Sequence, residues 1–345
     1  MATNQQFPTL SNEQGQIFPQ MSMIRAQYWQ DDTRWVGNRI APVFQVNLPL
    51  IRMTRWSAAD ALPTLQGGLL RAKGDVGAQI GIQAPTYEDF FINEGMLTSV
   101  VPDREVHEAP SIDPDRPWRV RTKMATGFLL LENEMRIKSY FDPTDPLFPA
   151  AQLVAASGNW QTYNPTTDEV ISDDILANKI RFTQFANGQR PNFLIVDQLT
   201  DSFFLRKLAR ERDTRVAIGS YGGAQVPDLL PSADGRVVSD MQIIVPGALK
   251  ETTPDDAVYS PDYAWGNFPY AVMGYSPTLA GGLWDQTGDA YIANAEYVPD
   301  GESAYETYRQ QDPVIMNKRS FMWWNFNRQL KLLKPELVLA IGPIR

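Results

Sequence analysis

The spacing of apolar residues predicts a long helix over residues 117–140. Its apolar positions recur at intervals of four, three and four, which places one set on a single face: Met124, Phe128, Leu131 and Met135. Pro117 suits the first turn, because the N–H that proline lacks has no helical partner there. We expect the apolar face to be buried and four polar side chains to face water: Arg121, Glu132, Asn133 and Arg136.

Shorter elements are predicted on the C-terminal side of this helix. A second helix is expected to end at Asn187-Gly188, since glycine and asparagine favour the left-handed conformation that closes helices. Residues 193–196 are apolar at every position, which is typical of a strand buried on both faces. A third helix is predicted from about residue 200. Further strands are predicted at 40–48, 241–245, 270–275, 321–326, 330–333 and 337–341.

Two segments lack the pattern of an independently folding unit. Residues 1–30 contain only two charged side chains, Glu13 and Arg25, and scattered apolar residues without period. We interpret them as an arm that orders against another surface; a floppy terminus is the alternative. Residues 52–92 are punctuated by glycine and have few bulky apolar residues in their middle. Loops of more than about 12–15 residues without structure of their own are uncommon in a compact domain and usually have a function. Residues 52–92 therefore predict a long projecting loop or hairpin, with a returning strand at 87–92.

Composition excludes several kinds of chemistry. The 345 residues contain no cysteine and one histidine, His107, which excludes disulfides, thiolate nucleophiles and multi-histidine metal sites. There is no phosphate-binding loop, zinc-protease motif or serine-hydrolase elbow. The formal net charge of −9 makes any contact with nucleic acid weak and local. We also expect a soluble, intracellularly made protein, because no signal peptide or membrane-spanning stretch is seen.

The order of these parts resembles the major capsid proteins of tailed bacteriophages, which have the Hong Kong-type shell fold. In that family an arm is followed by a strand, a long loop, a spine helix and a later buried strand. The segments that carry the resemblance are RIAPVFQV at 39–46, NPTTD at 164–168, GQRPNFLIV at 188–196 and AVMGYSP at 271–277.

The resemblance implies an α+β fold with an N-terminal arm, an extended loop, a peripheral domain with a long spine helix, and an axial domain. The implied divisions are an arm at 1–35, a peripheral domain at 36–51 and 93–190, the loop at 52–92, an axial domain at 191–312, and C-terminal strands at 313–345 that return to the peripheral domain.

The resemblance also implies a structural role without enzyme activity or cofactor. The chain would assemble with itself into hexamers and pentamers of an icosahedral shell enclosing phage dsDNA, in the host cytoplasm, and become part of the virion. Its further partners would be a separate scaffolding protein, a portal, a decoration protein and packaged dsDNA bound by weak non-specific contacts, with no membrane. No lysine–asparagine crosslinking site is matched.

Contacts between copies are expected in the arm and the loop, because the entropy lost on ordering such segments is offset only on a partner's surface. The candidate contact residues are Phe7, Phe18, Arg52, Arg55, Trp56, Arg71, Lys73, Tyr87 and Phe90.

Two other functions stay open at this point. An acidic carbohydrate-binding or glycoside-hydrolysing protein is possible, since Trp284-Asp285 and the segment Trp29–Asp32 pair tryptophan with acid. Nucleic-acid binding is suggested by interleaved basic and aromatic residues near the C-terminus, although their alternation is more typical of a strand with one packed face. These residues are Lys318, Arg319, Trp323, Trp324, Arg328, Lys331 and Lys334.

Overall fold

The structure is a computed structural model of the chain. It describes residues 16–17, 19–31, 35–41, 43–55, 86–160, 170–202, 229–232, 235–238, 241–251, 261–266, 268–277, 279, 290–299, 306–311 and 319–344.

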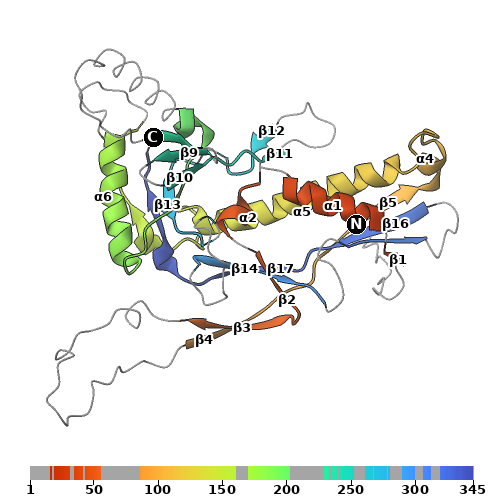
Figure 1. Ribbon diagram of the computed structural model, residues 1–345, viewed down its shortest axis with the longest axis horizontal. Coiled ribbons are helices and arrows are strands. Elements are labelled where there is room, and N and C mark those ends of the chain that lie inside the picture. Colours follow the sequence, from red (N-terminus) through yellow and green to blue (C-terminus); the bar gives the residue numbers. More distant parts are fainter. Residues whose placement is uncertain are drawn as a thin grey trace, which may run out of the picture.

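One long helix runs through the molecule, and the prediction of a helix at 117–140 is confirmed. The described part of the chain contains the helices α1 (Pro19–Asp31), α2 (Gly37–Ile40), α4 (Asp103–His107), α5 (Arg116–Phe141) and α6 (Val170–Phe185), with short 3-10 turns at Ala150–Gln152 and Pro335–Leu337. Residues 198–202 are helical as well. Figure 1 shows α5 extending from the sheet region to the opposite end of the molecule, with α1 lying along it. The helix α6 ends as predicted, because Asn187 and Gly188 adopt positive φ angles of 52° and 87°.

The largest sheet gathers strands from distant parts of the chain. Its seven strands, in spatial order, are β6 (Leu153–Val154), β18 (Val338–Ile341), β13 (Ala271–Gly274), β7 (Phe193–Ile195), β10 (Met241–Ile244), β9 (Gly235–Val238) and β8 (Leu229–Ser232). The strand predicted at 193–196 is confirmed as β7, with all three residues buried. The helix α6 packs against β18. The hydrophobic core of this part includes Ile137 and Phe141, at the C-terminal end of α5.

Two smaller sheets lie along α5, and β11 (Leu249–Glu251) and β12 (Pro261–Tyr263) form a separate two-stranded sheet. One sheet has the order β1 (Gln16–Ile17), β15 (Thr307–Gln311), β16 (Arg319–Asn325) and β5 (Met96–Pro102), all antiparallel. The other has the order β17 (Arg328–Leu332), β14 (Ile292–Tyr297) and β2 (Val43–Val46). Its β2 pairs parallel with β14 and joins distant chain segments.

The loop expected at 52–92 begins and ends as a two-stranded ribbon. Strands β3 (Leu50–Arg55) and β4 (Thr86–Phe91) pair antiparallel over six residue pairs. Figure 1 shows the ribbon pointing away from the sheets and helices. The predicted returning strand is therefore confirmed, while residues 56–85 lie outside the described residues.

The predicted buried face of α5 is wrong. Met124 and Phe128 are 59% and 61% exposed, and Leu131 and Met135 are only half-buried. The helix instead buries a neighbouring face that includes Trp118, Leu130 and Asn133. Of these three residues, the polar Asn133 had been expected to face water. Both faces contain apolar residues at helical spacing, so periodicity alone does not tell which one other elements cover.

The N-terminal segment is also corrected in part. Residues 1–15 lie outside the described residues, but residues 19–31 form α1 and pack on the chain's own α5 and β15. Met21 is buried beside Trp118 and Trp324. Arg25 is buried and donates hydrogen bonds to the carbonyl oxygens of Glu306 (2.8 Å) and Asn325 (2.7 Å). Patterns of apolar residues do not reveal a buried position that is occupied by a charged residue such as Arg25. This explains why no helix was predicted here.

Two further expectations differ in detail. The strand predicted at 40–48 is limited to β2, because residues 37–40 form α2. The strand β16 buries both faces, since Trp323 and Trp324 are each fully buried. Trp323 stacks on Tyr308 at a ring distance of 5.5 Å, whereas Trp324 lies in the cluster with α1 and α5.

The predicted C-terminal segment divides between sheets. Residues 338–341 form β18 and pair with β13, a strand expected in the axial domain, while β16 and β17 belong to the smaller sheets. Likewise α6, expected in the peripheral domain, packs on β18. Among the described residues, no helix combines the length and apolar character needed to span a bilayer.

Candidate intersubunit surfaces

The outer face of the ribbon exposes apolar side chains at its base. Leu50 and Phe91 lie directly opposite each other across β3 and β4, and they are 59% and 57% exposed. Leu48, just before β3, is exposed as well. Facing cross-strand pairs stabilise a ribbon, but this pair leaves most of its apolar area in water. The ribbon therefore offers an apolar surface that its own chain does not cover.

An ion pair follows on the same ribbon face. Arg52 and Asp89 are opposite each other, and the guanidinium donates two hydrogen bonds of 2.7 Å to the two carboxylate oxygens. This arrangement lowers the pKa of Asp89, chiefly through the hydrogen bonds from Arg52. Two charges so paired leave the ribbon face without a net charge at this position, which suits contact with another surface.

The opposite face of the ribbon is fixed to the body. Phe90 and Ile92 are buried with Phe44 of β2 and Leu333, and Ile51 packs against the same cluster. The amide of Ile92 also donates a hydrogen bond of 2.8 Å to the Pro49 carbonyl. Phe90, a predicted contact between copies, therefore lies in its own chain's core. Its burial holds the base of the ribbon in place.

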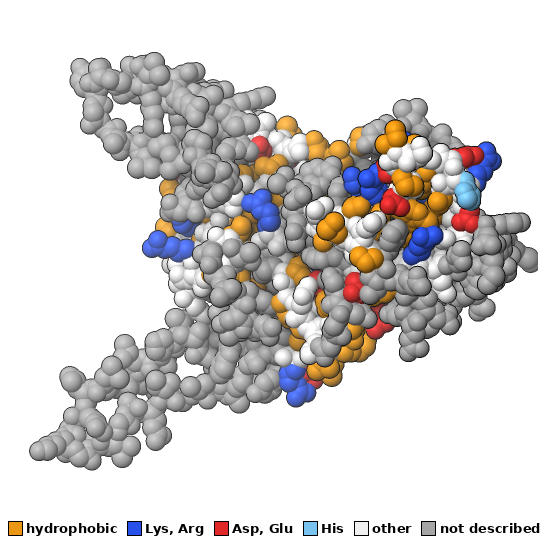
Figure 2. All heavy atoms as spheres, turned by 45° about the vertical axis from the view of Figure 1, so that its right-hand side comes forward, with side chains coloured by type: hydrophobic (Ala, Val, Ile, Leu, Met, Phe, Trp, Pro, Cys, Tyr) orange, Lys and Arg blue, Asp and Glu red, His pale blue; other side chains and the backbone are white. Residues whose placement is uncertain are grey.

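A second exposed apolar surface follows α5. Val120, Met124 and Phe128 form a stripe at intervals of four residues. Toward α4 the stripe borders a groove of about 510 Å³, lined in part by Pro110, Pro117, Val120 and Met124. Figure 2 shows hydrophobic side chains gathered at this end of the molecule, between basic and acidic ones. The sequence signal for this surface was the apolar periodicity that we assigned to the core.

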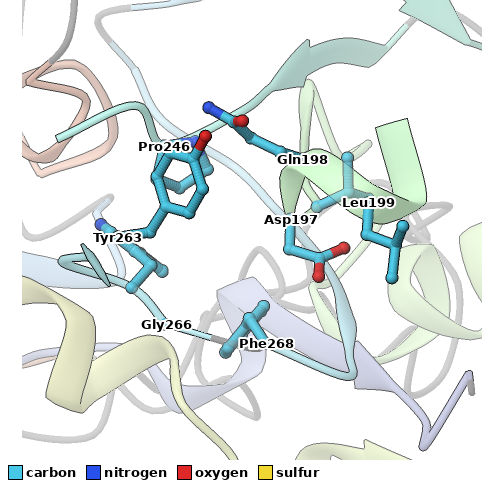
Figure 3. A pocket seen from close by; sticks show the side chains of 9 residues that line it. Asp197, Gln198, Leu199, Pro246, Tyr263, Gly266 and Phe268 are labelled. Atoms are coloured by element: carbon cyan, nitrogen blue, oxygen red, sulfur yellow. The ribbon is translucent and has the colours of Figure 1, made fainter. Parts of the chain in front are cut away.

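Two further hollows among the described residues are smaller. One of about 370 Å³ lies between the segment after the ribbon and α5, with Glu94, Arg136 and Tyr140 in its lining. Another of about 90 Å³ is shown in Figure 3, where Asp197 and Leu199 lie across from Tyr263. Ligand pockets usually have volumes of about 300–1,000 Å³, so the latter is too small for a sugar. Its Asp197 instead accepts a hydrogen bond of 2.8 Å from the Thr200 amide.

The predicted contact residues are only partly described. Phe7, Phe18, Trp56, Arg71 and Lys73 lie outside the described residues. Of the others, Arg52 is exposed on the ribbon and Phe90 is buried at its base. Arg55 and Tyr87 lie in β3 and β4, where their partners in register are Thr86 and Thr54.

The nucleic-acid interpretation loses its central residues. Trp323 and Trp324 are fully buried and present no ring face on which a base could stack. Arg328 is buried too, and its Nε donates a hydrogen bond of 2.8 Å to Glu296. For the carbohydrate interpretation, Trp284-Asp285 lies outside the described residues, as do Asp32 and the side chains of residues 29–31.

Comparison with solved structures identifies the fold. Over 95% of this chain and 97% of the other, the structure matches a phage-related protein from Bordetella bronchiseptica with a TM-score of 0.58 and 16% sequence identity. It matches the SrpI encapsulin from Synechococcus elongatus over 91% and 89% of the two chains, with a TM-score of 0.50 and 10% identity. A subunit of the mature capsid of bacteriophage PhiM1 gives a TM-score of 0.47 at 9% identity over 89% and 86%.

No family model and no curated protein matches the sequence. The likeness is thus one of three-dimensional structure at low sequence identity. The α+β class is confirmed, and so is the resemblance to the Hong Kong-type shell fold at the level of the fold. In its fold, this chain is similar to the phage-related protein and to the encapsulin.

Proposed function

We propose that this chain is the major capsid protein of a tailed bacteriophage, a structural protein that assembles with itself into hexamers and pentamers of an icosahedral shell enclosing dsDNA. Its place would be the virion, after assembly in the host cytoplasm. The observation that carries the proposal is the fold match along nearly the whole of both chains with the phage-related protein.

The exposed apolar surfaces support assembly between copies. Leu50 and Phe91 project from a ribbon that is held rigid by Phe90 and Ile92, so little entropy is lost when its base meets a partner. Fully burying one such large apolar side chain contributes about 1.5–3 kcal/mol. Each copy in a shell makes several contacts, so modest contributions at each one suffice for a stable closed particle.

The other partners follow from the same proposal. A separate scaffolding protein and a portal would guide closure, and a decoration protein would bind the outside of the shell. The acidic net charge of −9 limits the packaged dsDNA to weak, non-specific contacts. The predicted contact residues in the arm and the loop belong to the same proposal.

Assembly can be tested directly with the full chain. We expect the purified protein, alone or produced with its scaffold, to form closed particles visible by negative-stain electron microscopy and to sediment far faster than a 38.9 kDa monomer. A glycan array probed with the same preparation serves as the control for a carbohydrate-binding role. A chain that stays monomeric under every assembly condition, or that binds a glycan as a single subunit, would contradict the proposal.

A further inference from the structure

The exposed apolar stripe of α5 is a continuous surface. Its members, Val120, Met124 and Phe128, follow one another at intervals of four residues and are 47%, 59% and 61% exposed. They cover about 12 Å of the helix, at 1.5 Å per residue. Single apolar residues are ordinary on a surface, but a row of adjacent ones usually marks a place where another molecule binds.

The stripe has the shape on which a second helix packs. Beside Met124 and Phe128 lies Gly127, where a Cβ would meet nothing within 4 Å. A row of side chains spaced by four residues, with a gap next to it, allows the ridges of one helix to enter the grooves of another. Toward α4 the row runs into the groove of about 510 Å³, to which Val120 contributes. The stripe therefore fits an elongated, helical occupant.

On one side of the stripe the charges are balanced within the chain. Arg121 pairs with Glu105 of α4 at 2.7 Å, and Glu132 pairs with Arg136 at 2.8 Å. Arg121 and Glu132 are eleven residues apart, which is about three turns, so both lie along the same side of the helix. This side needs no charge from a partner.

The other side of the stripe carries two cations without a counter-ion. Arg116 and Lys123 are both exposed and lie seven residues apart, which is about two turns, so they share one side of the helix. Among the described residues no carboxylate forms an ion pair with either of them, the neighbouring Asp115 included. A wholly apolar partner would take water from these two charges without replacing it by an opposite charge. A partner with acidic side chains at this edge would pair with both.

We propose that α5 binds an amphipathic helix of another protein, whose apolar face covers the stripe and whose one edge carries two acidic residues seven positions apart, opposite Arg116 and Lys123. Interleaved apolar side chains supply the contact area, and the acidic edge selects the partner. The inference goes beyond the proposed function, because it concerns a different protein and does not depend on the formation of a shell.

The charges disfavour two other occupants. None of the described helices of this chain exposes two acidic residues seven positions apart, so a second copy does not supply the acidic edge. An anionic membrane surface attracts helices whose polar face is rich in lysine and arginine. Here Glu105 and Glu132 lie along one side of the stripe, which places acidic groups where such a surface would be.

A pair of synthetic peptides tests the acidic edge. Both are labelled 18-residue helices whose leucines recur at intervals of four, three and four; one has glutamate at two edge positions seven apart, and the other has lysine there. Fluorescence anisotropy with the purified full chain measures their affinities. We expect the acidic peptide to bind at least about tenfold more tightly, and the difference to shrink as salt is added.

Charge reversal on the protein assigns the preference to the two cations. The double variant Arg116→Glu, Lys123→Glu should prefer the lysine peptide. The control is the double variant Arg181→Glu, Arg190→Glu, which changes the net charge equally at two exposed arginines outside α5 and should keep the preference for the acidic peptide. Equal affinities of the wild type for the two peptides, or a control that also reverses, would overturn the proposal.

The apolar stripe is tested separately. Phe128→Asp should weaken binding of the acidic peptide by about tenfold to a hundredfold, the equivalent of losing one buried apolar side chain. Ile180→Asp, at an exposed position of α6, should change it by less than about twofold. Circular dichroism should show both variants folded, because both side chains are exposed.

A disulfide locates the bound peptide, because the chain has no cysteine of its own. An acidic peptide with one central cysteine should form a mixed disulfide with the Gly127→Cys chain, seen as an added peptide mass on a non-reducing gel. Gln184→Cys, at an exposed position of α6, should form little of it. Equal yields at the two positions would show that the peptide does not lie on the stripe.

The remaining outcomes identify a different occupant. Vesicles of phosphatidylcholine and phosphatidylserine that bind the wild type more tightly than the acidic peptide does would assign the stripe to a membrane surface. Phe128→Asp protein that no longer forms particles in the absence of any peptide would assign it to a contact between copies. Either result overturns the proposal, whereas the proposed function depends only on whether the wild type assembles.

Discussion

The indole N–H of Trp265 donates a hydrogen bond of 2.7 Å to Oε1 of Glu134, in the middle of α5. The other carboxylate oxygen accepts a hydrogen bond of 2.8 Å from the amide of Gly37, at the start of α2. One buried side chain thus ties the long helix to two segments that are far away in sequence. Any change in its hydrogen-bonding capacity or charge should therefore affect the stability of the whole fold.

Burial raises the pKa of Glu134 above its usual value of 4.5, and the hydrogen bonds from Trp265, Gly37 and Val36 only partly oppose this effect. A carboxyl group with a raised folded-state pKa stabilises the fold most below its unfolded pKa, and this stabilisation is lost as the pH rises through the folded pKa. We expect Glu134→Gln to lower the free energy of unfolding by about 1–3 kcal/mol near pH 4.5, because an amide NH₂ cannot accept a hydrogen bond.

The difference between the two proteins should shrink as the pH rises, since only the wild type loses stability by ionisation at this position. Urea unfolding of the wild type and of Glu134→Gln at a series of pH values measures this difference in the free energy of unfolding. The control is Glu132→Gln, an exposed glutamate on the same helix whose change should cost less than about 0.5 kcal/mol throughout. A difference that is constant with pH would contradict the raised pKa.

Replacing either of two glycines, Gly37 and Gly127, with alanine should change the stability of the protein in opposite directions. A Cβ at Gly37 would lie 2.7 Å from Cδ1 of Ile137 and 2.8 Å from Oε2 of Glu134, whereas a Cβ at Gly127 would meet nothing within 4 Å. We expect Gly37→Ala to destabilise the protein by about 1–3 kcal/mol through this crowding. Gly127→Ala, within α5, should stabilise it by about 0.5–1 kcal/mol. Thermal unfolding of both variants gives the comparison, and equal shifts would show that α2 does not approach α5 so closely.

Arg25 should anchor α1 to the body. Arg25→Ala removes a buried side chain and leaves the carbonyls of Glu306 and Asn325 without these hydrogen bonds, so we expect a loss of about 2–4 kcal/mol. Gln27→Ala, on the exposed side of α1, is the matched control. Hydrogen exchange should show faster exchange in α1 of the first variant only. Unchanged protection of α1 would mean that Arg25 does not hold it.

The ribbon should be needed for assembly and not for folding. Replacing both Leu50 and Phe91 with Asp places two charges on its exposed face, and we expect assembled particles to be lost while the circular dichroism spectrum is kept. Leu176→Asp, at an exposed position of α6, should assemble normally. Sedimentation velocity distinguishes the two. Particles formed by the double variant would exclude this ribbon face from the contacts.

The long helix, the buried strand β7 and the ribbon could all be predicted from the sequence, because each depends on local signals. Helical spacing between Pro117 and Pro143 set the limits of α5, and four apolar residues in a row indicated β7. A glycine-rich stretch too poor in bulky residues to form a core indicated the projecting hairpin. The order of these parts sufficed for the resemblance that the structural comparison confirmed at the level of the fold.

Tertiary structure alone decided which surfaces stay uncovered. The helix α5 has two adjacent apolar faces, and the face with Leu130 and Ile137 is buried because α1, α2 and distant strands pack there. Met124 and Phe128, equally apolar, are left in water beside the groove. The burial of Arg25 likewise depends on carbonyls some 280 and 300 residues away in the chain. Local sequence specifies that a segment is helical and amphipathic, but long-range packing determines which of its faces remains for a partner.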